Sequence, residues 1–225
     1  MPVDEHARKM ALYEQFARVG KALANPVRLE LLDLLAQGER SVENVAETAG
    51  MKLSNTSAQL RTLAGAGLVT SRRDGVKIYY RLPDQQVSAF VGQVQEFAAS
   101  RLAEAEHAAR NYLGDVEALE PVAQDELYRR LRDGQVLALD VRPEAEYAAG
   151  HIPGAVNVPH DQLAARLAEL PESADIVAYC RGRYCVLAPD AVRLLRARGF
   201  SARPLEGGLP DWRLAGLPVT ARASA

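Results

Sequence analysis

Residues 68–82 read LVTSRRDGVKIYYRL, with two β-prone runs on either side of Asp74 and Gly75. An Asp-Gly pair between such runs predicts a tight β-hairpin, and both positions of this turn class need positive φ. Alternate residues of the second run would point to opposite faces of the strand. The stretch therefore predicts a basic hairpin that ends at Pro83.

Helical patterns precede this hairpin. Apolar residues recur at three-to-four spacing in the first segment. Asn25-Pro26 then marks a helix start, with Asn as the cap and Pro at the first helical position. Gly38 ends that helix, and Ser41 can cap the next one. The expected helices span 4–24, 27–37, 41–49 and 53–64.

One long helix is expected after the hairpin, from Asp84 to Leu113. Its apolar residues form a narrow stripe, and a helix of this kind usually packs on another helix, often from a second subunit. The acidic stretch GDVEALEP at 114–121 follows as a linker. We therefore predict a first domain over 1–114 and a second domain over 115–225.

The sequence pattern changes after the linker. Short apolar runs at 136–140, 176–179 and 203–205 alternate with helical stretches. This alternation indicates an α/β domain with a mostly parallel sheet. The helical stretches lie near 123–133, 160–170 and 186–198.

The order of the first elements, helices followed by a basic hairpin, fits a winged helix-turn-helix. In such a fold a helix end enters the major groove while the hairpin meets the phosphates. QLRTLAGAGLV at 59–69, followed by the wing pattern R-x-G-x-x-x-Y-Y-x-L, resembles the DNA-binding core of ArsR-type regulators. The resemblance covers roughly residues 10–110. It implies a homodimer, held by the first and last helices, that binds a palindromic duplex DNA operator.

By its position, the helix that begins near Leu53 is the expected recognition helix. Residues 52–81 hold six basic residues and one acid, Asp74. This local excess suggests a polyanion partner, although a solvated basic face is the alternative. The candidate base-reading residues are Ser54, Asn55, Ser57 and Gln59, and the candidate phosphate contacts are Arg61, Arg72, Arg73 and Lys77.

Composition limits the class of protein. Of 225 residues, 48% are hydrophobic and 25% are charged, which is a globular balance. No run approaches the roughly 18 apolar residues of a membrane helix, and the charged N-terminal stretch has no signal-peptide core. We expect a cytoplasmic protein without a membrane partner. The first domain has no cysteine and the long helix has only His107, so we expect neither an ArsR-type metal site nor a cofactor.

The strongest chemical signal is IVAYCRGRYCVLAPDAV at 176–192, where an apolar strand leads directly into Cys180. A helix is expected to begin near Val186. The loop N–H groups, the positive end of this helix, Arg181 and Arg183 all favour a thiolate over a thiol. Cys180 is therefore predicted to be nucleophilic at neutral pH. The alternative is a buried structural cysteine.

Two flanking motifs favour the reactive cysteine. LDVRPEAEYAAGHIPGAVNVP at 139–159 and EGGLPDWRLAGLPV at 206–219 resemble the rhodanese domain, and the match covers roughly residues 117–222. The resemblance implies five strands with helices on both faces, and a persulfide of sulfane sulfur on Cys180. Asp140 and Arg142 would form a supporting polar network. The scaffold residues would be His151 and Asn157, and Trp212 would pack the final helix.

The fold class expected for the whole chain is thus a mainly α-helical winged helix-turn-helix followed by an α/β rhodanese-like domain with a central parallel sheet. Phosphatases and arsenate reductases on the second fold carry a C-x5-R loop whose arginine grips a tetrahedral dianion. Six residues after Cys180 this chain has Val186, so both activities are disfavoured. Cys185 is either a resolving thiol for a Cys180 persulfide, which we favour, or a small apolar residue that opens the helix.

Three functions remain open. The leading hypothesis is a transcriptional repressor whose rhodanese domain senses or handles reactive sulfur through Cys180. The second is a sulfurtransferase that moves sulfur from thiosulfate or another donor to a thiol, with the DNA-binding domain attached. The third is a rhodanese domain that only recruits a partner, which the presence of Cys180 weakens. The expected partners are an operator, a second copy of the chain, and thiosulfate or polysulfide.

Overall fold

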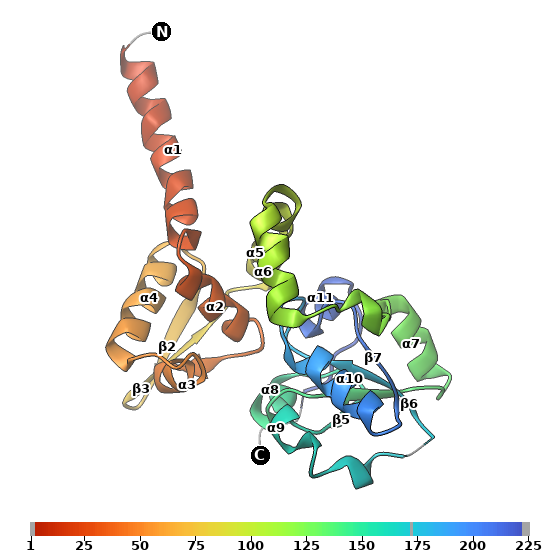
Figure 1. Cartoon of the computed structure of the whole chain (residues 1–225). Helices are drawn as coiled ribbons and strands as arrows, with labels where there is room; N and C mark the ends of the chain where they lie inside the picture. The colour runs from red at the N-terminus through yellow and green to blue at the C-terminus, as the bar shows by residue number, and fades with distance from the viewer. Residues whose placement is uncertain (1–2, 172, 222–225) are drawn as a thin grey trace. The chain divides into compact units, whose positions relative to one another are not determined.

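The computed structural model describes residues 3–171 and 173–221. The chain divides into two compact units, one up to Val91 and one from Gly92 onward (Figure 1). The division falls upstream of the linker at which the sequence predicts the domain boundary. Among the described residues, no helix combines the length and the apolar character that crossing a membrane would require.

Four helices open the first unit, and two of them, α2 and α3, start at the predicted caps. The Asn25 side chain accepts a hydrogen bond from the Arg28 N–H at 3.2 Å, and Ser41 accepts one from Asn44 at 3.3 Å. Both caps satisfy backbone donors that a helix start leaves unpaired. The helices are α1 (Val3–Leu23), α2 (Pro26–Leu35), α3 (Val42–Thr48) and α4 (Leu53–Gly65).

The predicted hairpin belongs to a three-stranded antiparallel sheet of order β1-β3-β2. Its strands are β1 (Arg40–Ser41), β2 (Thr70–Asp74) and β3 (Lys77–Arg81). Asp74 pairs with Lys77, so the turn consists of Gly75 and Val76. Gly75 has φ of 58°, whereas Asp74 does not have positive φ. The predicted pair of positive φ values was therefore wrong, because Asp74 still belongs to the strand ladder. A glycine in the first turn position is typical of the II′ class.

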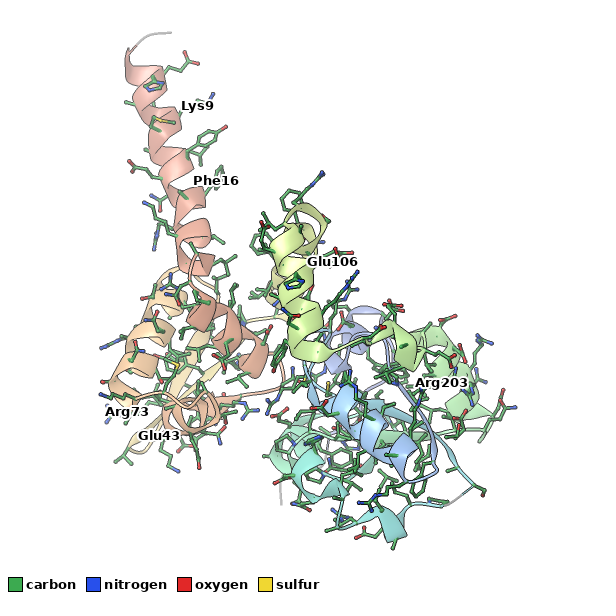
Figure 2. All side chains as sticks on the ribbon, viewed as in Figure 1. Lys9, Phe16, Glu43, Arg73, Glu106 and Arg203 are labelled. Carbon is green, nitrogen blue, oxygen red and sulfur yellow. The ribbon has the colours of Figure 1, made fainter. Side chains whose placement is uncertain are left out.

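The core of the first unit lies under α2 and α4. Leu31 and Leu35 of α2 and Leu60 and Leu63 of α4 are fully or almost fully buried. By contrast, α1 carries large apolar side chains on its surface, and Phe16 is 62% exposed (Figure 2). Among the α1 residues whose side chains the structure describes, the large apolar ones that are exposed are Met10, Leu12, Tyr13 and Phe16.

The single long helix predicted over 84–113 was wrong, because the structure has α5 (Gln85–Arg101) and α6 (Ala103–Leu113). Leu102 separates them with an extended backbone, at φ −116° and ψ 105°. The charged residues on either side of Leu102 favour a helix end and a helix start there. Arg101 lies in the last turn of α5, and Glu104 and Glu106 lie in the first turn of α6. A cation at a helix end and anions at a helix start each interact favourably with the helix dipole.

The second unit contains a parallel sheet of order β5-β4-β6-β7. Its strands are β4 (Leu137–Asp140), β5 (Val156–Asn157), β6 (Asp175–Tyr179) and β7 (Ser201–Pro204). The resemblance implied five strands, and the fifth place holds only an isolated bridge between Val122 and Leu205. Pro121 has no N–H to donate and α7 begins at Gln124, so this segment is too short for a longer ladder.

Helices cover both faces of this sheet (Figure 1). Ile176 and Ala178 of β6 pack in one apolar cluster, and Val177 and Tyr179 pack in the other, as strand alternation requires. Trp212 is fully buried in the second cluster, and its indole N–H donates to the Pro218 carbonyl at 2.8 Å. The α-helices are α7 (Gln124–Arg132), α8 (Glu144–Ala149), α9 (His160–Leu163), α10 (Leu187–Ala197) and α11 (Leu209–Leu214); short 3₁₀ turns span Glu117–Leu119 and Leu167–Glu169.

Candidate functional site

Cys180 lies where the sequence predicts it, directly after β6 and at the carboxyl end of the parallel sheet. Its side chain is 1% exposed and packs in the apolar cluster. Its Sγ lies 3.4 Å from the carbonyl oxygen of Cys185 and 3.9 Å from that of Gly182. The intervening loop thus curls around the sulfur and ends at Val186, the residue that caps α10.

Cys185 is the second thiol of this loop, half-buried and not bonded to Cys180. The neighbouring Cys180 thiol lowers the pKa of Cys185 to about 7, against the effect of burial. The backbone N–H groups of Arg181 and Leu187 and the Arg181 guanidinium lower this pKa further. Cys185 therefore carries the first negative charge of the pair near neutral pH.

The burial of Cys180 opposes the thiolate that the sequence predicts there. Burial raises the pKa of the Cys180 thiol, and the neighbouring Cys185 raises it further, which outweighs the N–H groups of Gly182 and Ala188. A charged sulfur in an apolar cluster loses its hydration, so the proton stays on the more deeply buried sulfur. Burial therefore favours the protonated form of Cys180 in the reduced loop.

Arg181 is positioned by an acidic residue that the sequence did not single out. Its Nε donates to Glu146 Oε1 at 3.0 Å and its Nη2 donates to the same oxygen at 2.6 Å. Glu146 lies on α8 and is 3% exposed. The ion pair ties α8 to the cysteine loop and compensates the arginine charge beside the two thiols. Glu144 and Glu146 lie close together in the sequence, and no sequence pattern distinguishes Glu146 as the partner of Arg181.

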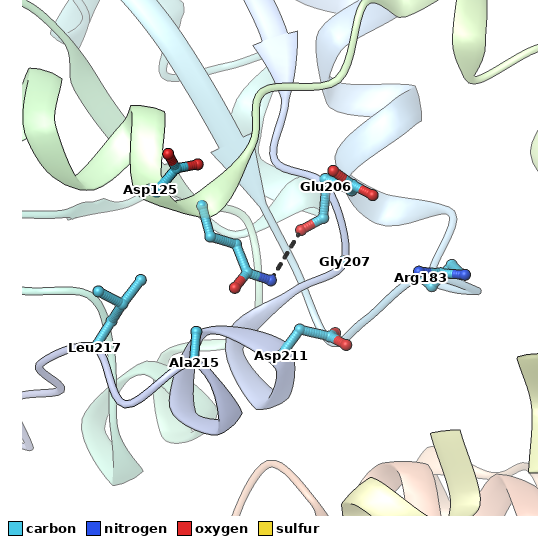
Figure 3. A pocket seen from close by; sticks show the side chains of 8 residues that line it. Asp125, Arg183, Glu206, Gly207, Asp211, Ala215 and Leu217 are labelled. Atoms are coloured by element: carbon cyan, nitrogen blue, oxygen red, sulfur yellow. Dashed lines mark hydrogen bonds between the residues drawn. The ribbon is translucent and has the colours of Figure 1, made fainter. Parts of the chain in front are cut away.

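The Arg183 side chain lies in a pocket beside the cysteine loop rather than with the two thiols. It lines a pocket of about 380 Å³ together with acidic side chains (Figure 3). The Gln124 amide on the far wall donates to the Glu206 carbonyl at 3.5 Å. The lining residues are Gln124, Asp125, Arg183, Glu206, Gly207, Asp211, Ala215 and Leu217. The sequence grouped Arg183 with the thiols, whereas the structure places it in this adjoining pocket.

Gly208 allows the EGGLPDW segment to approach the cysteine loop. A Cβ at this position would lie 2.5 Å from the Gly182 nitrogen and 2.6 Å from the Cys180 carbonyl oxygen. The next residue, Leu209, donates its N–H to that same carbonyl at 3.2 Å. Only glycine fits such a close contact between two backbones. The paired glycines at 207–208 were the sequence signal for it.

Asp140 and Arg142 form the expected polar network, and both side chains are fully buried. Arg142 donates to both Asp140 oxygens, at 3.0 and 2.6 Å, and to the Gly150 carbonyl at 2.8 Å. Asn157 donates to the carbonyls of Asp140 and Arg142, each at 2.9 Å. His151 stacks on Tyr147, and its Nδ1 lies 2.8 Å from the Tyr147 carbonyl oxygen. These contacts join β4, β5 and the GHIPGA segment beside the cysteine loop.

The predicted base-reading residues all lie on α4 but differ in exposure. Ser54 and Asn55 are exposed, whereas Ser57 and Gln59 are half-buried. Gln59 is held by Arg28 of α2, whose Nη1 donates to Gln59 Oε1 at 2.9 Å. The Gln59 amide in turn donates to Asn55 Oδ1 at 3.2 Å.

The predicted phosphate contacts also differ, because three of them are exposed and one is engaged in ion pairs. Arg61, Arg73 and Lys77 are exposed, and Arg73 extends from the wing (Figure 2). Arg72 instead donates to Glu39 at 2.6 Å and to Asp74 at 3.1 Å, and it lies over the Tyr79 ring at 4.5 Å. These two acids raise the pKa of Arg72 and compensate its charge. Within residues 3–171 and 173–221, no three His, Cys, Asp or Glu side chains are grouped so that they could hold a metal ion.

Comparison with known proteins assigns both parts of the chain. The model of the rhodanese-like domain matches residues 123–215, and that of a helix-turn-helix domain matches residues 23–72. A sulfurtransferase of Allochromatium vinosum is 34% identical over 102 residues, covering 44% of this chain and 94% of that protein. The structure of the homodimeric winged helix-turn-helix domain of Mb0332 from Mycobacterium bovis is 52% identical, covers 42% of this chain and 88% of that one, and has a TM-score of 0.40.

One relative spans both domains. The HTH-type transcriptional regulator Rv0324 of Mycobacterium tuberculosis is 53% identical over 212 residues, covering 94% of this chain and 93% of that protein. The two domains therefore occur together in a protein of the same length and order. The chain belongs to the ArsR-type helix-turn-helix transcriptional regulators that carry a C-terminal rhodanese domain.

Proposed function

We propose that this regulator is a repressor whose DNA binding responds to reactive sulfur, which it takes up as a persulfide on Cys180. The observation that carries the proposal is the pair of free thiols in one loop, with Cys180 Sγ 3.4 Å from the Cys185 carbonyl oxygen. Reactive cysteines need a lowered thiolate pKa and an adjacent group that accepts a proton. In this loop the lowered pKa belongs to Cys185, which supplies the group that accepts the Cys180 proton.

The chemistry balances in two steps. In the first, the Cys180 sulfur attacks the outer sulfur of thiosulfate or the terminal sulfur of a polysulfide. A new S–S bond forms on Cys180, its proton passes to the Cys185 thiolate, and sulfite or the shortened polysulfide leaves with the electron pair. In the second, Cys185 attacks the Cys180 sulfur. A Cys180–Cys185 disulfide forms, and the outer sulfur leaves as hydrosulfide, which carries the Cys185 proton.

Contacts within the second unit offer a route out of the loop. Cys185 lies two residues before α10, and Arg193 of α10 donates through Nη2 to the carbonyl of Leu113 at 2.5 Å. Leu113 is the last residue of α6. On the same helix, Arg196 donates to the Leu119 carbonyl at 2.9 Å. A displacement at the start of α10 would therefore be transmitted through these hydrogen bonds to the end of α6.

A dimer would place such a change next to DNA. The exposed apolar residues Tyr13 and Phe16 of α1, together with Phe97 of α5, are 51%, 62% and 64% exposed. Apolar faces of this kind on helices are commonly covered by a second copy. We therefore propose a homodimer in which these helices meet. Sulfur loading would bias the spacing of the two α4 helices on the operator.

A sulfurtransferase is the second candidate function, and the pocket beside the loop favours it. A volume of about 380 Å³ with Arg183 on one wall could admit a small anionic donor or a thiol acceptor. Both functions begin with the same persulfide, so labelling alone does not separate them. Repeated turnover of thiosulfate with a thiol acceptor favours the enzyme, whereas a single round of sulfur uptake per chain favours the sensor.

The test of the shared step is intact-mass measurement after treatment with polysulfide. The wild type should gain sulfur transiently, with peptide mapping placing it on Cys180, and should end as the Cys180–Cys185 disulfide, which is lighter than the reduced chain by two hydrogen atoms. Cys180→Ser should abolish the gain, whereas Cys185→Ser should accumulate the persulfide because nothing resolves it. Continued sulfur gain by Cys180→Ser would refute the assignment of the nucleophile. Aryl phosphates and arsenate should not react, because Val186 replaces the arginine of the phosphate loop.

A further inference from the structure

Three polar side chains form a hydrogen-bonded chain that ends on the exposed start of α4. Arg28 of α2 donates to Gln59 Oε1 at 2.9 Å, and Gln59 Nε2 donates to Asn55 Oδ1 at 3.2 Å. Arg28 is itself fixed, because Nε donates to the Ala22 carbonyl at 2.5 Å and Nη2 to the Lys21 carbonyl at 2.9 Å. The guanidinium thus joins the end of α1 to α4.

The hydrogen bonds in this series can be donated in one direction only, from Arg28 to Gln59 and from Gln59 to Asn55. Arginine has N–H donors and no acceptor, so Gln59 must turn its oxygen toward Arg28. Its NH₂ group then faces Asn55, and an NH₂ group can be met only by an acceptor. Asn55 must therefore turn Oδ1 toward Gln59. Its own NH₂ group lies on the other side of the amide carbon, and the residue is exposed.

An oriented amide changes what asparagine can read. A freely rotating asparagine contacts adenine with both groups, accepting from N6 and donating to N7. Here the oxygen is engaged by Gln59, so the NH₂ group is the part offered to a base edge. In the major groove guanine presents two adjacent acceptors, N7 and O6, whereas adenine presents one acceptor beside a donor. An outward NH₂ group fits guanine better.

We propose that the Arg28–Gln59 pair makes Asn55 a donor-only reader that selects guanine over adenine at one operator position. Arg28 and Gln59 act as positioning residues, and Asn55 is the specificity-determining one. The proposal rests on α4 being the recognition helix of this regulator. It does not depend on the sulfur response.

The experiment is selection of operators from a random duplex library by the reduced full-length protein, followed by sequencing. Comparison of the wild type with Asn55→Ala identifies the position that Asn55 reads, because its base preference is lost there. At that position the wild type should prefer guanine over adenine by about tenfold. Replacing this guanine by 7-deazaguanine, which lacks the N7 acceptor, should weaken binding of the wild type but not of Asn55→Ala.

Gln59→Glu is the decisive variant, because a carboxylate has acceptors only. It still accepts from Arg28, but it must also accept from Asn55, whose amide therefore turns its oxygen outward. The preference at this one position should move from guanine toward adenine or cytosine, which present amino donors. Gln59→Leu serves as the second variant. It removes the constraint, so guanine and adenine should become nearly equivalent there.

The readout is a base preference at one position, so a general loss of affinity does not imitate the result. A wild type that prefers adenine at the Asn55 position overturns the inference, and so does a guanine preference that persists in Gln59→Glu and Gln59→Leu. A wild-type protein that enriches no sequence would overturn the DNA-binding role together with the inference.

Discussion

Two thiols five residues apart behave differently because one is buried and the other is half-buried. Cys185 has its pKa lowered to about 7 by the Cys180 thiol, and burial raises the pKa of Cys180. Deprotonation of the pair therefore creates the base that takes the Cys180 proton during attack. The rate of sulfur gain should rise with pH because this base is absent below the pKa of Cys185.

This gives a pH prediction for the loop. The rate at which Cys180 gains sulfur from thiosulfate should rise through a midpoint near pH 7 in the wild type. In Cys185→Ser the base is lost and only the buried thiol remains, so the midpoint should move to higher pH. Stopped-time mass measurements across a pH series test this. An unchanged midpoint in Cys185→Ser would show that Cys185 does not assist the attack.

Arg72 and Arg73 are adjacent in sequence but should contribute differently to DNA binding. Arg73 is exposed, whereas Arg72 is compensated by Glu39 and Asp74. Each phosphate contact releases counterions, so Arg73→Ala should lower the slope of log affinity against log salt by about 1. Arg72→Ala should change that slope less while still weakening binding, because it frees the wing from Glu39. Titrations at several salt concentrations check this, and equal slope changes for both variants would contradict it.

At the scale of elements, the cysteine loop and the EGGLPDW segment are fitted to each other at Gly208. An alanine there would place Cβ 2.5 Å from the Gly182 nitrogen, and backbone atoms would have to shift. Gly208→Ala should therefore slow sulfur gain at Cys180 by at least tenfold, a ratio equal to about 1.4 kcal/mol of barrier. Gly92→Ala is the control, because its Cβ meets nothing within 4 Å and its backbone does not have positive φ. Loss of the same size in both variants would mean general destabilisation.

Sequence patterns predicted most helices and strands, but they did not predict the position of the hairpin turn or the break between α5 and α6. The hairpin was located correctly, but its turn begins at Gly75, because the Asp74–Lys77 pair extends the ladder by one residue. The helix over 84–113 kept its apolar stripe across the break at Leu102, so periodicity alone could not reveal two helices. The charges of Arg101 and Glu104 were the available signal.

The part of the site that lies within one sequence segment was predictable. Cys180 and Cys185 lie in a single loop after a buried strand, so spacing was enough to pair them. Glu146 reaches Arg181 from 35 residues away, and Gly208 lies 26 residues beyond Gly182. Such contacts depend on how α8 and the last loop pack on the sheet. The order of the two thiol pKa values depends on burial, which spacing does not report.

For the molecule as a whole, we propose that a sulfur signal leaves the cysteine loop along α10. Arg193 holds the Leu113 carbonyl at the end of α6, and the side chain is only half-buried. Arg193→Ala should leave sulfur gain at Cys180 unchanged but reduce the effect of sulfur on operator affinity. Arg198→Ala, an exposed arginine at the end of α10, is the control. Mass measurement and DNA titration on the same samples check both parts. A full sulfur effect in Arg193→Ala would exclude this route.

The most direct test of the sulfur-responsive repressor is operator affinity of the full-length protein, measured reduced and after polysulfide treatment, with intact mass on each sample. Coupling between two sites is typically about 1–3 kcal/mol, or about 5–150-fold in affinity. Polysulfide should weaken operator binding of the wild type by a factor in this range, and a thiol reductant should restore it. Cys180→Ser should bind in both conditions, and Cys185→Ser should hold a persulfide and respond weakly. Equal affinity of the reduced and the sulfur-loaded wild type would contradict the sensor and leave the sulfurtransferase as the function of the second domain.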